Sequence, residues 1–279
     1  NMGYVANQVD ALVEAGTIEP LIIATPTAFN KYQGSFYTNS AVTGLWDDFI
    51  TKDLVDYVDS NFRTLPQRES RGIAGYSMGG YGAIKLALLH PEVYGAAYAV
   101  SACCVSLEEQ FMVQDRQHLL AAASATVFNG AHWLVKAQIA AAAAFSPNPE
   151  AEPFFADFPL AEDGSLRPDV WERWLQHDPL TLLATHASGL IDMRLGLDVG
   201  ESDNIATGSH TFSEALTVMG VDHTFETYPG DHFSGIEGRV RNRVLPFMSD
   251  ALRTEPVTTG VAPTAWAVVK RVPASGSSH

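Results

Sequence analysis

The feature that most constrains the fold is a strand-like run that leads directly into a serine between two glycines. Arg71-Gly72-Ile73-Ala74-Gly75 is short and mostly apolar, and Tyr76-Ser77-Met78-Gly79 follows it at once. A helical segment, Gly79 to His90, begins immediately after this motif. A strand, a tight Gly-x-Ser-x-Gly turn and a helix form the geometry of a nucleophile elbow. The pattern predicts a strained backbone at Ser77, with glycines at the two positions where the turn leaves no room for a side chain.

The same alternation of strand and helix continues along much of the chain. Short apolar runs bounded by Gly or Pro are typical of buried parallel strands, and the segments between them have helical periodicity. This βαβ pattern predicts an α/β-hydrolase fold, with a mostly parallel central sheet flanked by helices. The expected strands are Leu21–Thr25, Arg71–Gly75, Ala96–Ser101, Met193–Val199 and Thr224–Tyr228.

One long segment interrupts the pattern. Residues 105–188 contain no clear strand but several helical stretches, which predicts a helical cap inserted between two parts of the core, 1–104 and 189–253. The tail, 254–279, includes Ala265–Val269, which could add an edge strand. The aromatic side chains of the cap either line an acyl pocket over Ser77 or form the cap's own core, and the second interpretation is favoured. They are Phe154, Phe155, Phe158, Trp171 and Trp174.

Composition excludes several classes of function. The formal net charge of −15 would repel a nucleic-acid backbone. The only two cysteines, Cys103 and Cys104, are adjacent, which rules out a disulfide framework and a zinc site built on Cys-x-x-Cys pairs. The acidic residues between Asp47 and Asp59 alternate with apolar ones and indicate an amphipathic helix rather than a metal site. No apolar run is long enough to cross a bilayer.

A serine nucleophile needs a base, and in this fold the acid and the histidine follow the serine in that order, each after a later strand. The strand Thr224–Tyr228 leads into Pro229-Gly230-Asp231-His232, so His232 is the expected base. The strand Met193–Val199 leads into Gly200-Glu201-Ser202-Asp203, and Asp203 is the expected acid. Asp198, inside that strand, and Glu201 remain alternatives.

These motifs resemble those of the Putative esterase family, which includes esterase D, feruloyl and acetylxylan esterases, tributyrin-type esterases and the mycolyltransferases. The later motifs, Gly200-x-x-Asp203 and Tyr228-Pro-Gly-x-His232, also match. The resemblance implies hydrolysis of carboxylic esters through an acyl-serine, without cofactor or metal. The earlier matching stretches are Tyr37-Thr38-Asn39-Ser40, Gly44-Leu45-Trp46 and Arg71 to Ala83.

The sequence departs from this family at the oxyanion hole. One donor is expected to be the backbone N–H of Met78, but the family's His-Gly strand, whose loop supplies the other, has no match here. The family's N-terminal strands are therefore expected to be missing from the chain, which begins at Asn1. The tail strand or a second copy in a homodimer could fill the gap. Tyr76 and Trp46 are candidate substrate-binding residues, although structural roles are favoured for both, with Trp46 bracing the active-site loop.

The sequence therefore predicts a serine carboxylesterase acting on small or short-chain acyl esters, aromatic acyl groups included. The alternatives are an acyltransferase with the same triad and a catalytically silent binding protein. The expected partner is a small-molecule ester. Secreted relatives of the family favour a secreted or periplasmic location over the cytoplasm.

Overall fold

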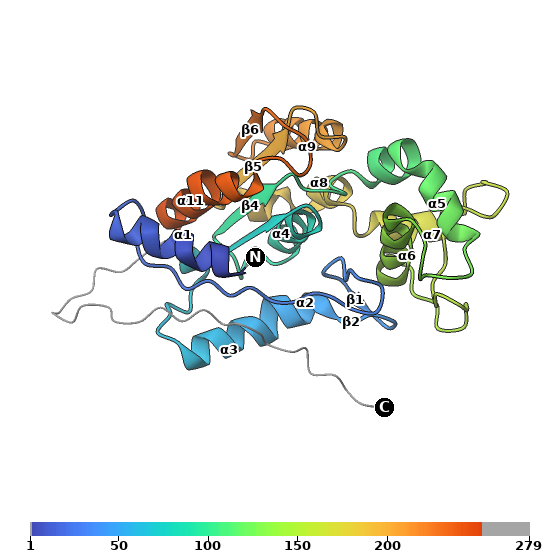
Figure 1. Cartoon of the computed structure of the whole chain (residues 1–279), viewed down its shortest axis with the longest axis horizontal. Coiled ribbons are helices and arrows are strands. Elements are labelled where there is room, and N and C mark those ends of the chain that lie inside the picture. Colours follow the sequence, from blue (N-terminus) through green and yellow to red (C-terminus); the bar gives the residue numbers. More distant parts are fainter. Residues whose placement is uncertain (1, 253–279) are drawn as a thin grey trace.

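The computed structural model describes residues 2–252, and its centre is a parallel sheet of four strands (Figure 1). The strand order is β3-β4-β5-β6, and every neighbouring pair is parallel. The sheet confirms the expected fold class, and four of the expected strands lie within one residue of their predicted bounds. These strands are β3 (Gly72–Tyr76), β4 (Ala96–Val100), β5 (Arg194–Gly200) and β6 (Thr224–Tyr228).

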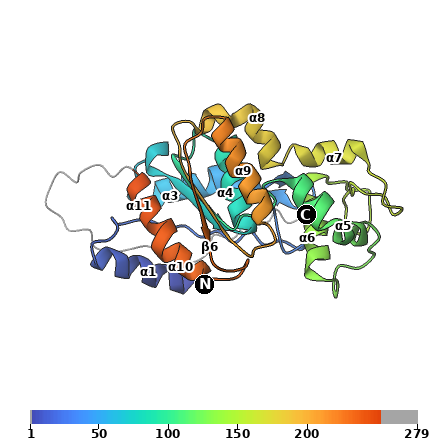
Figure 2. The same ribbon diagram turned by 90° about the horizontal axis from the view of Figure 1, so that it is seen from above.

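Helices cover both faces of this sheet, as the turned view shows (Figure 2). On one face, apolar residues of three helices pack against Ala97 and Leu195. The opposite face of β4, with Tyr98 and Val100, packs against Met248. The first face is covered by α4 (Met78–Leu89), α8 (Pro179–Leu190) and α9 (Ala206–Val218). The second is covered by α11 (Leu245–Ala251), which continues α10 (Ile236–Arg239) and the π-helical turn η4 (Val240–Val244).

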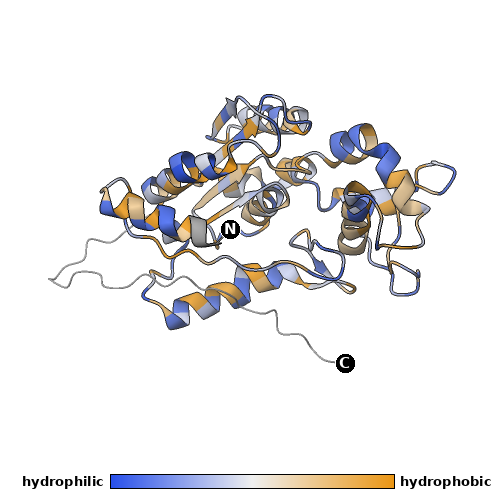
Figure 3. Ribbon diagram, viewed as in Figure 1, coloured by the Kyte–Doolittle hydropathy of each residue, from blue (hydrophilic) through white to orange (hydrophobic). Residues whose placement is uncertain are grey.

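Strand β4 is buried on both faces, as is typical of a central strand in a parallel sheet. All five of its residues are buried, and successive side chains enter opposite apolar clusters. A strand buried on both faces has no polar alternation, which matches its sequence, Ala-Ala-Tyr-Ala-Val. The hydropathy colouring shows the same contrast between the sheet interior and the mixed surfaces of the outer helices (Figure 3).

The predicted strand at Leu21–Thr25 is wrong. The segment forms an isolated β-bridge at Ala24 rather than a strand, and Ile22 is 40% exposed. Leu21 and Ile23 instead pack against α1 (Met2–Glu14) and the η4 region. A strand needs a hydrogen-bonded neighbour, and within residues 2–252 no strand pairs with the free edge of β3. The other predicted edge strand, Ala265–Val269, lies outside the described residues.

The predicted acidic helix forms, but in three parts. It consists of α2 (Trp46–Asp48), the π-helical turn η1 (Phe49–Asp53) and α3 (Leu54–Asn61), after the short β1 (Asn39–Ser40) and β2 (Gly44–Leu45). Three of its carboxylates form ion pairs, which agrees with a structural acidic face. Asp47 pairs with His90 at 2.7 Å, Asp48 with Lys52 at 2.6 Å, and Asp59 with Arg71 at 2.8 Å.

The helices after β4 form a second apolar cluster beside the sheet, seen at the right of Figures 1 and 2. Most of the cap aromatics, including Phe154 and Trp174, are buried in this cluster, as the favoured interpretation expected. The last helix of the segment, α8, packs on the core helix α4 and not in this cluster. The domain boundary at 188 stays a prediction. The cluster comprises η3 (Glu108–Gln114), α5 (Arg116–Ala123), α6 (Trp133–Phe145) and α7 (Pro168–Leu175). Among the described helices, none has the length and apolarity needed to span a membrane.

Candidate active site

Ser77 occupies the turn between β3 and α4 in a backbone conformation that L-amino acids rarely adopt. Its φ is 56° and its ψ is −118°. The turn is held from β4, because Ser77 N–H donates to Val100 O at 3.0 Å and Cys103 N–H donates to Ser77 O at 3.2 Å. A Cβ at Gly75 would lie 2.1 Å from the carbonyl carbon of Gly79, so glycine is required there. The predicted elbow is thus present in the fold.

Three side chains from three loops form one hydrogen-bonded chain at this turn. Ser77 Oγ lies 2.9 Å from His232 Nε2. On the other side of the ring, His232 Nδ1 lies 2.9 Å from Asp203 Oδ2. The Asp203 side chain is fully buried and the imidazole is 16% exposed. A buried carboxylate on one nitrogen leaves the other nitrogen free to accept the serine proton.

The loops after β5 and β6 fix the relative position of Asp203 and His232. Ser202 N–H donates to Gly230 O at 2.9 Å, and Glu201 N–H donates to Tyr228 O at 2.8 Å. A Cβ at Gly200 would lie 2.5 Å from Gly230 O, so the two loops are in direct backbone contact. The glycines of both motifs therefore allow the acid and the base to approach each other.

The alternative acids lie elsewhere. Asp198 Oδ2 accepts hydrogen bonds from Tyr98 O–H at 2.9 Å and from Arg239 Nε at 2.8 Å. Glu201 is exposed. Asp198 thus bonds to the partly buried guanidinium of Arg239 rather than to the imidazole. Sequence reasoning missed Arg239, because its helix follows the site and nothing in its local pattern shows which strand residue it contacts.

Other histidines are occupied by structural contacts. His223 Nε2 lies 2.8 Å from Ser213 Oγ. His177 stacks on Phe145 with ring centroids 4.9 Å apart, and burial, with the charge on Lys85, lowers its pKa to about 3. This imidazole is therefore neutral and part of the core.

Tyr76 and Trp46 occupy different positions. Tyr76 O–H donates to the carbonyl oxygen of His232 at 2.6 Å, and their ring centroids are 5.2 Å apart. Burial, together with the charge on Asp203, raises the pKa of Tyr76 to about 12, so its hydroxyl remains a donor. Trp46 is buried and its Nε1–H donates to Thr43 O at 2.6 Å. These contacts brace the site and its neighbouring loop; substrate binding by either residue stays a prediction.

Met78 is the first residue of α4, so its N–H is among the helix N-terminal donors that have no intrahelical acceptor. The helix dipole adds partial positive charge at this end. A Cβ at Gly34 would lie 3.0 Å from Met78 Sδ, so the loop before β1 contacts this end of α4. The arrangement suits an oxygen that gains negative charge next to Ser77.

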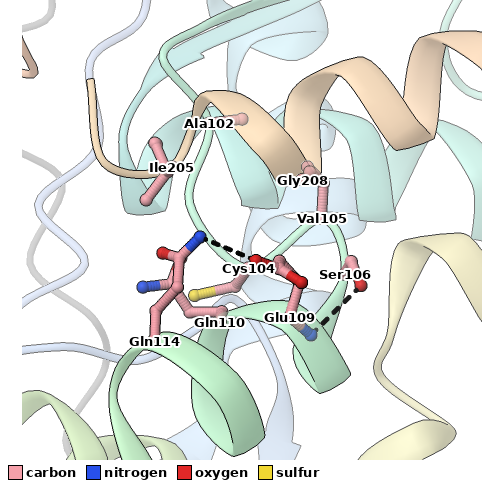
Figure 4. Close-up of a pocket in the computed structure, with 9 residues that line it drawn as sticks. All are labelled: Ala102, Cys104, Val105, Ser106, Glu109, Gln110, Gln114, Ile205 and Gly208. Atoms are coloured by element: carbon pink, nitrogen blue, oxygen red, sulfur yellow. Dashed lines mark hydrogen bonds between the residues drawn. The ribbon is translucent and has the colours of Figure 1, made fainter. Parts of the chain in front are cut away.

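A small pocket lies beside Ile205 (Figure 4). The backbone N–H of Ile205 donates to Asp203 Oδ1 at 3.1 Å, so the pocket is close to Asp203. Its cavity volume is about 10 Å³, and it lies where η3 meets the start of α9. Ile205 and Gly208 line it from α9 and the residue preceding that helix, opposite Gln110 and Gln114 of η3. The buried thiol of Cys104 also lines it. This contact joins the helical segment to the loop that carries Asp203.

Lys85 is a fully buried cation that sequence reasoning also missed, although a lone lysine in the apolar helix α4 was a visible signal. Its Nζ donates to Thr38 Oγ1, and to Tyr37 O at 3.4 Å. The ammonium also lies over the rings of Tyr81 and Phe145. Lys85 thereby ties the 34–40 loop to α4.

Known proteins share this fold and part of this sequence. Esterase Rv1288 and Esterase MT1326 of Mycobacterium tuberculosis are each 36% identical over 73 residues, which is 25% of this chain and 15% of the relative. The match thus spans a small part of those longer proteins.

Among solved structures, a ferulic acid esterase aligns with a TM-score of 0.58 at 20% identity, covering 90% of this chain and 79% of that one. MPT51 of Mycobacterium tuberculosis aligns with a TM-score of 0.52 at 18% identity, covering 89% and 83%. At these identities the likeness establishes the α/β-hydrolase fold.

The family model described as Putative esterase matches residues 2–235, a range that includes the elbow, the acid loop and the histidine. The chain belongs to this esterase family.

Proposed function

We propose that the protein is a serine carboxylesterase that hydrolyses small or short-chain acyl esters, aromatic acyl groups included. The observation that carries this proposal is the continuous chain from Asp203 through His232 to Ser77, with 2.9 Å at each step. It spans loops that are far apart in sequence and ends on a serine with a positive φ.

In the proposed mechanism, Ser77 Oγ attacks the ester carbonyl carbon while its proton moves to His232 Nε2. Asp203 orients the imidazole and stabilises its cation. The carbonyl oxygen becomes an oxyanion, and Met78 N–H donates to it. His232 then protonates the leaving alcohol, and an activated water hydrolyses the acyl-serine by the same steps.

A fluorophosphonate probe and a chromogenic ester test this proposal together. The wild-type chain is expected to gain the probe's mass on Ser77 and to hydrolyse p-nitrophenyl acetate. Ser77→Ala should lose the label and about 10⁶-fold in kcat, because no other nucleophile replaces the hydroxyl. An unlabelled, inactive wild type would contradict the enzyme proposal.

Acyl transfer would use the same residues and differ only in the acceptor. Product analysis with an added alcohol measures the partition of the acyl group between water and the alcohol. If most of the acyl group goes to the alcohol even at low alcohol concentration, the main reaction is acyl transfer and not hydrolysis.

A further inference from the structure

The side chain of Tyr37 lies along α4 and points toward the helix end that carries Met78. A Cβ at Gly82 would lie 2.3 Å from Cδ2 of the Tyr37 ring, whereas a Cβ at Gly79 would lie 3.6 Å from its hydroxyl oxygen. Gly79 is one turn closer to the N-terminus of the helix than Gly82. The phenol therefore projects its oxygen along the helix toward the nucleophile.

The surroundings leave this hydroxyl free to donate. Within residues 2–252, no hydrogen bond involves the Tyr37 hydroxyl, although hydrogen bonds use its backbone N–H and C=O. Burial, with the nearby Cys103, raises the pKa of Tyr37, so the O–H keeps its proton. The backbone N–H of Cys103 also donates to Ser77 O, so Cys103 is a neighbour of both Tyr37 and Ser77.

The loop holds Tyr37 in a defined position. Phe36 and Tyr37 both have a φ of 47°, a conformation that persists only where surrounding contacts fix it. Tyr37 N–H donates to Ser35 Oγ at 3.1 Å, and Thr38 Oγ1–H donates to Phe36 O at 2.7 Å. Lys85 holds the carbonyl of Tyr37 from α4. A donor fixed before the substrate arrives is what oxyanion stabilisation requires.

We propose that the phenolic O–H of Tyr37 is the second donor of the oxyanion hole, beside Met78 N–H. The inference rests on the proposed esterase function. As the Ser77 Oγ–carbon bond forms, the electron pair of the carbonyl π bond moves onto oxygen, and that oxygen accepts both hydrogen bonds. The Tyr37 proton stays on the phenol throughout; only the serine proton is transferred, to His232.

Tyr37→Phe tests the hydroxyl while keeping the ring that packs on Gly82. The expected result is a decrease of about 10²–10³-fold in kcat for p-nitrophenyl acetate, with KM changed by less than about threefold, because the donor acts on the transition state. A trifluoromethyl ketone that forms a tetrahedral adduct with Ser77 should bind more weakly by the same factor.

Tyr32→Phe provides the matched control. Tyr32 lies in the same loop, and its hydroxyl donates to Phe154 O at 2.7 Å in the helical segment. Removing it is expected to lower the melting temperature but to leave kcat within about threefold, since that bond is structural. Tyr37→Phe should show the reverse pattern.

The outcomes separate this inference from the proposed function. If the wild type hydrolyses the ester and Tyr37→Phe keeps kcat and ketone affinity within threefold, the Tyr37 assignment is wrong and the esterase stands. If the wild type neither turns over esters nor reacts with the fluorophosphonate, both are wrong.

Discussion

The proposed site has an acid–base side, around Asp203 and His232, and an oxyanion side, around Met78 and Tyr37. Each side contains one cation, and the two cations are satisfied in opposite ways. On the acid–base side, Arg239 joins Asp198 at 2.7 Å and Glu226 at 2.8 Å, next to the strands that carry Asp203 and His232. On the oxyanion side, Lys85 bonds only to neutral oxygens and faces aromatic rings. Among residues 2–252, no carboxylate lies within ion-pair distance of its Nζ.

This difference indicates different responses to pH. An arginine between two carboxylates stays charged over the whole accessible range. A buried lysine without a counter-ion loses its proton readily, and burial lowers the pKa of Lys85 to about 7. The ion pairs of Arg239 are therefore expected to be independent of pH near neutrality, whereas the attachment of the 34–40 loop by Lys85 is not.

The largest expected effect is on kcat, and it distinguishes Asp203 from Asp198. Asp203→Asn should lower kcat by about 10⁴-fold, because the amide holds the imidazole in the wrong tautomer. Asp198→Asn should leave kcat within a few fold, since that carboxylate bonds to Arg239 and Tyr98. Ester turnover by the two purified variants checks this, and equal losses would mean that Asp198 acts in the reaction.

The second effect concerns the free energy of unfolding and the contribution of Arg239 to it. The Asp198 side chain is fully buried, so Arg239→Met leaves a buried carboxylate without its main partner. The free energy of unfolding is expected to fall by about 3–5 kcal/mol. Arg243→Met, which removes a partly exposed partner of the same Glu226, should cost less than about 1 kcal/mol. Urea unfolding of both variants compares them, and similar values would contradict the bracing role of Arg239.

The third effect is a pH dependence on the oxyanion side, the smallest of the three when expressed per pH unit. The pKa of Lys85 is about 7 in the folded state and about 10.5 in the unfolded chain, so between these values the unfolded state binds the extra proton. The contribution of Lys85 to the unfolding free energy should therefore rise with pH in this window, by at most about 1.4 kcal/mol per pH unit.

Lys85→Met removes the titrating group and supplies the reference for this measurement. The difference between wild type and variant should be constant below about pH 6 and should change steadily between about pH 7.5 and 9.5, in favour of the wild type. Denaturation curves at several pH values give this difference. If the unfolding free energies of wild type and Lys85→Met change in parallel with pH, Lys85 stays charged in the folded state.

Local sequence patterns predicted the parts of the molecule that depend on neighbouring residues. The elbow at Ser77 is specified by Gly75 and by the strand and helix that flank it, and the positions of Asp203 and His232 follow from the strands before them. Contacts across the fold were beyond such reasoning. Arg239 meets Asp198 from a helix 41 residues later, and Tyr37 reaches α4 from an irregular loop whose φ values no motif predicts.

The failure at Leu21–Thr25 has a similar cause. An apolar run predicts burial, and Leu21 and Ile23 are indeed packed against α1 and η4. Whether such a run becomes a strand depends on a partner edge, which is a property of the sheet and not of the run. The sequence therefore indicated the apolar character of the segment but not its hydrogen-bonding state.

The position of β3 at the margin of the described sheet has a consequence for amide hydrogen exchange. Among residues 2–252, β4 has partners on both sides, whereas β3 is paired with β4 alone, and Ala74 at its middle is exposed. Backbone amides of β3 that face away from β4 are expected to exchange through small local fluctuations, and those of β4 only through larger opening. The two marginal strands of the described sheet, β3 and β6, are then expected to exchange faster than β4 and β5.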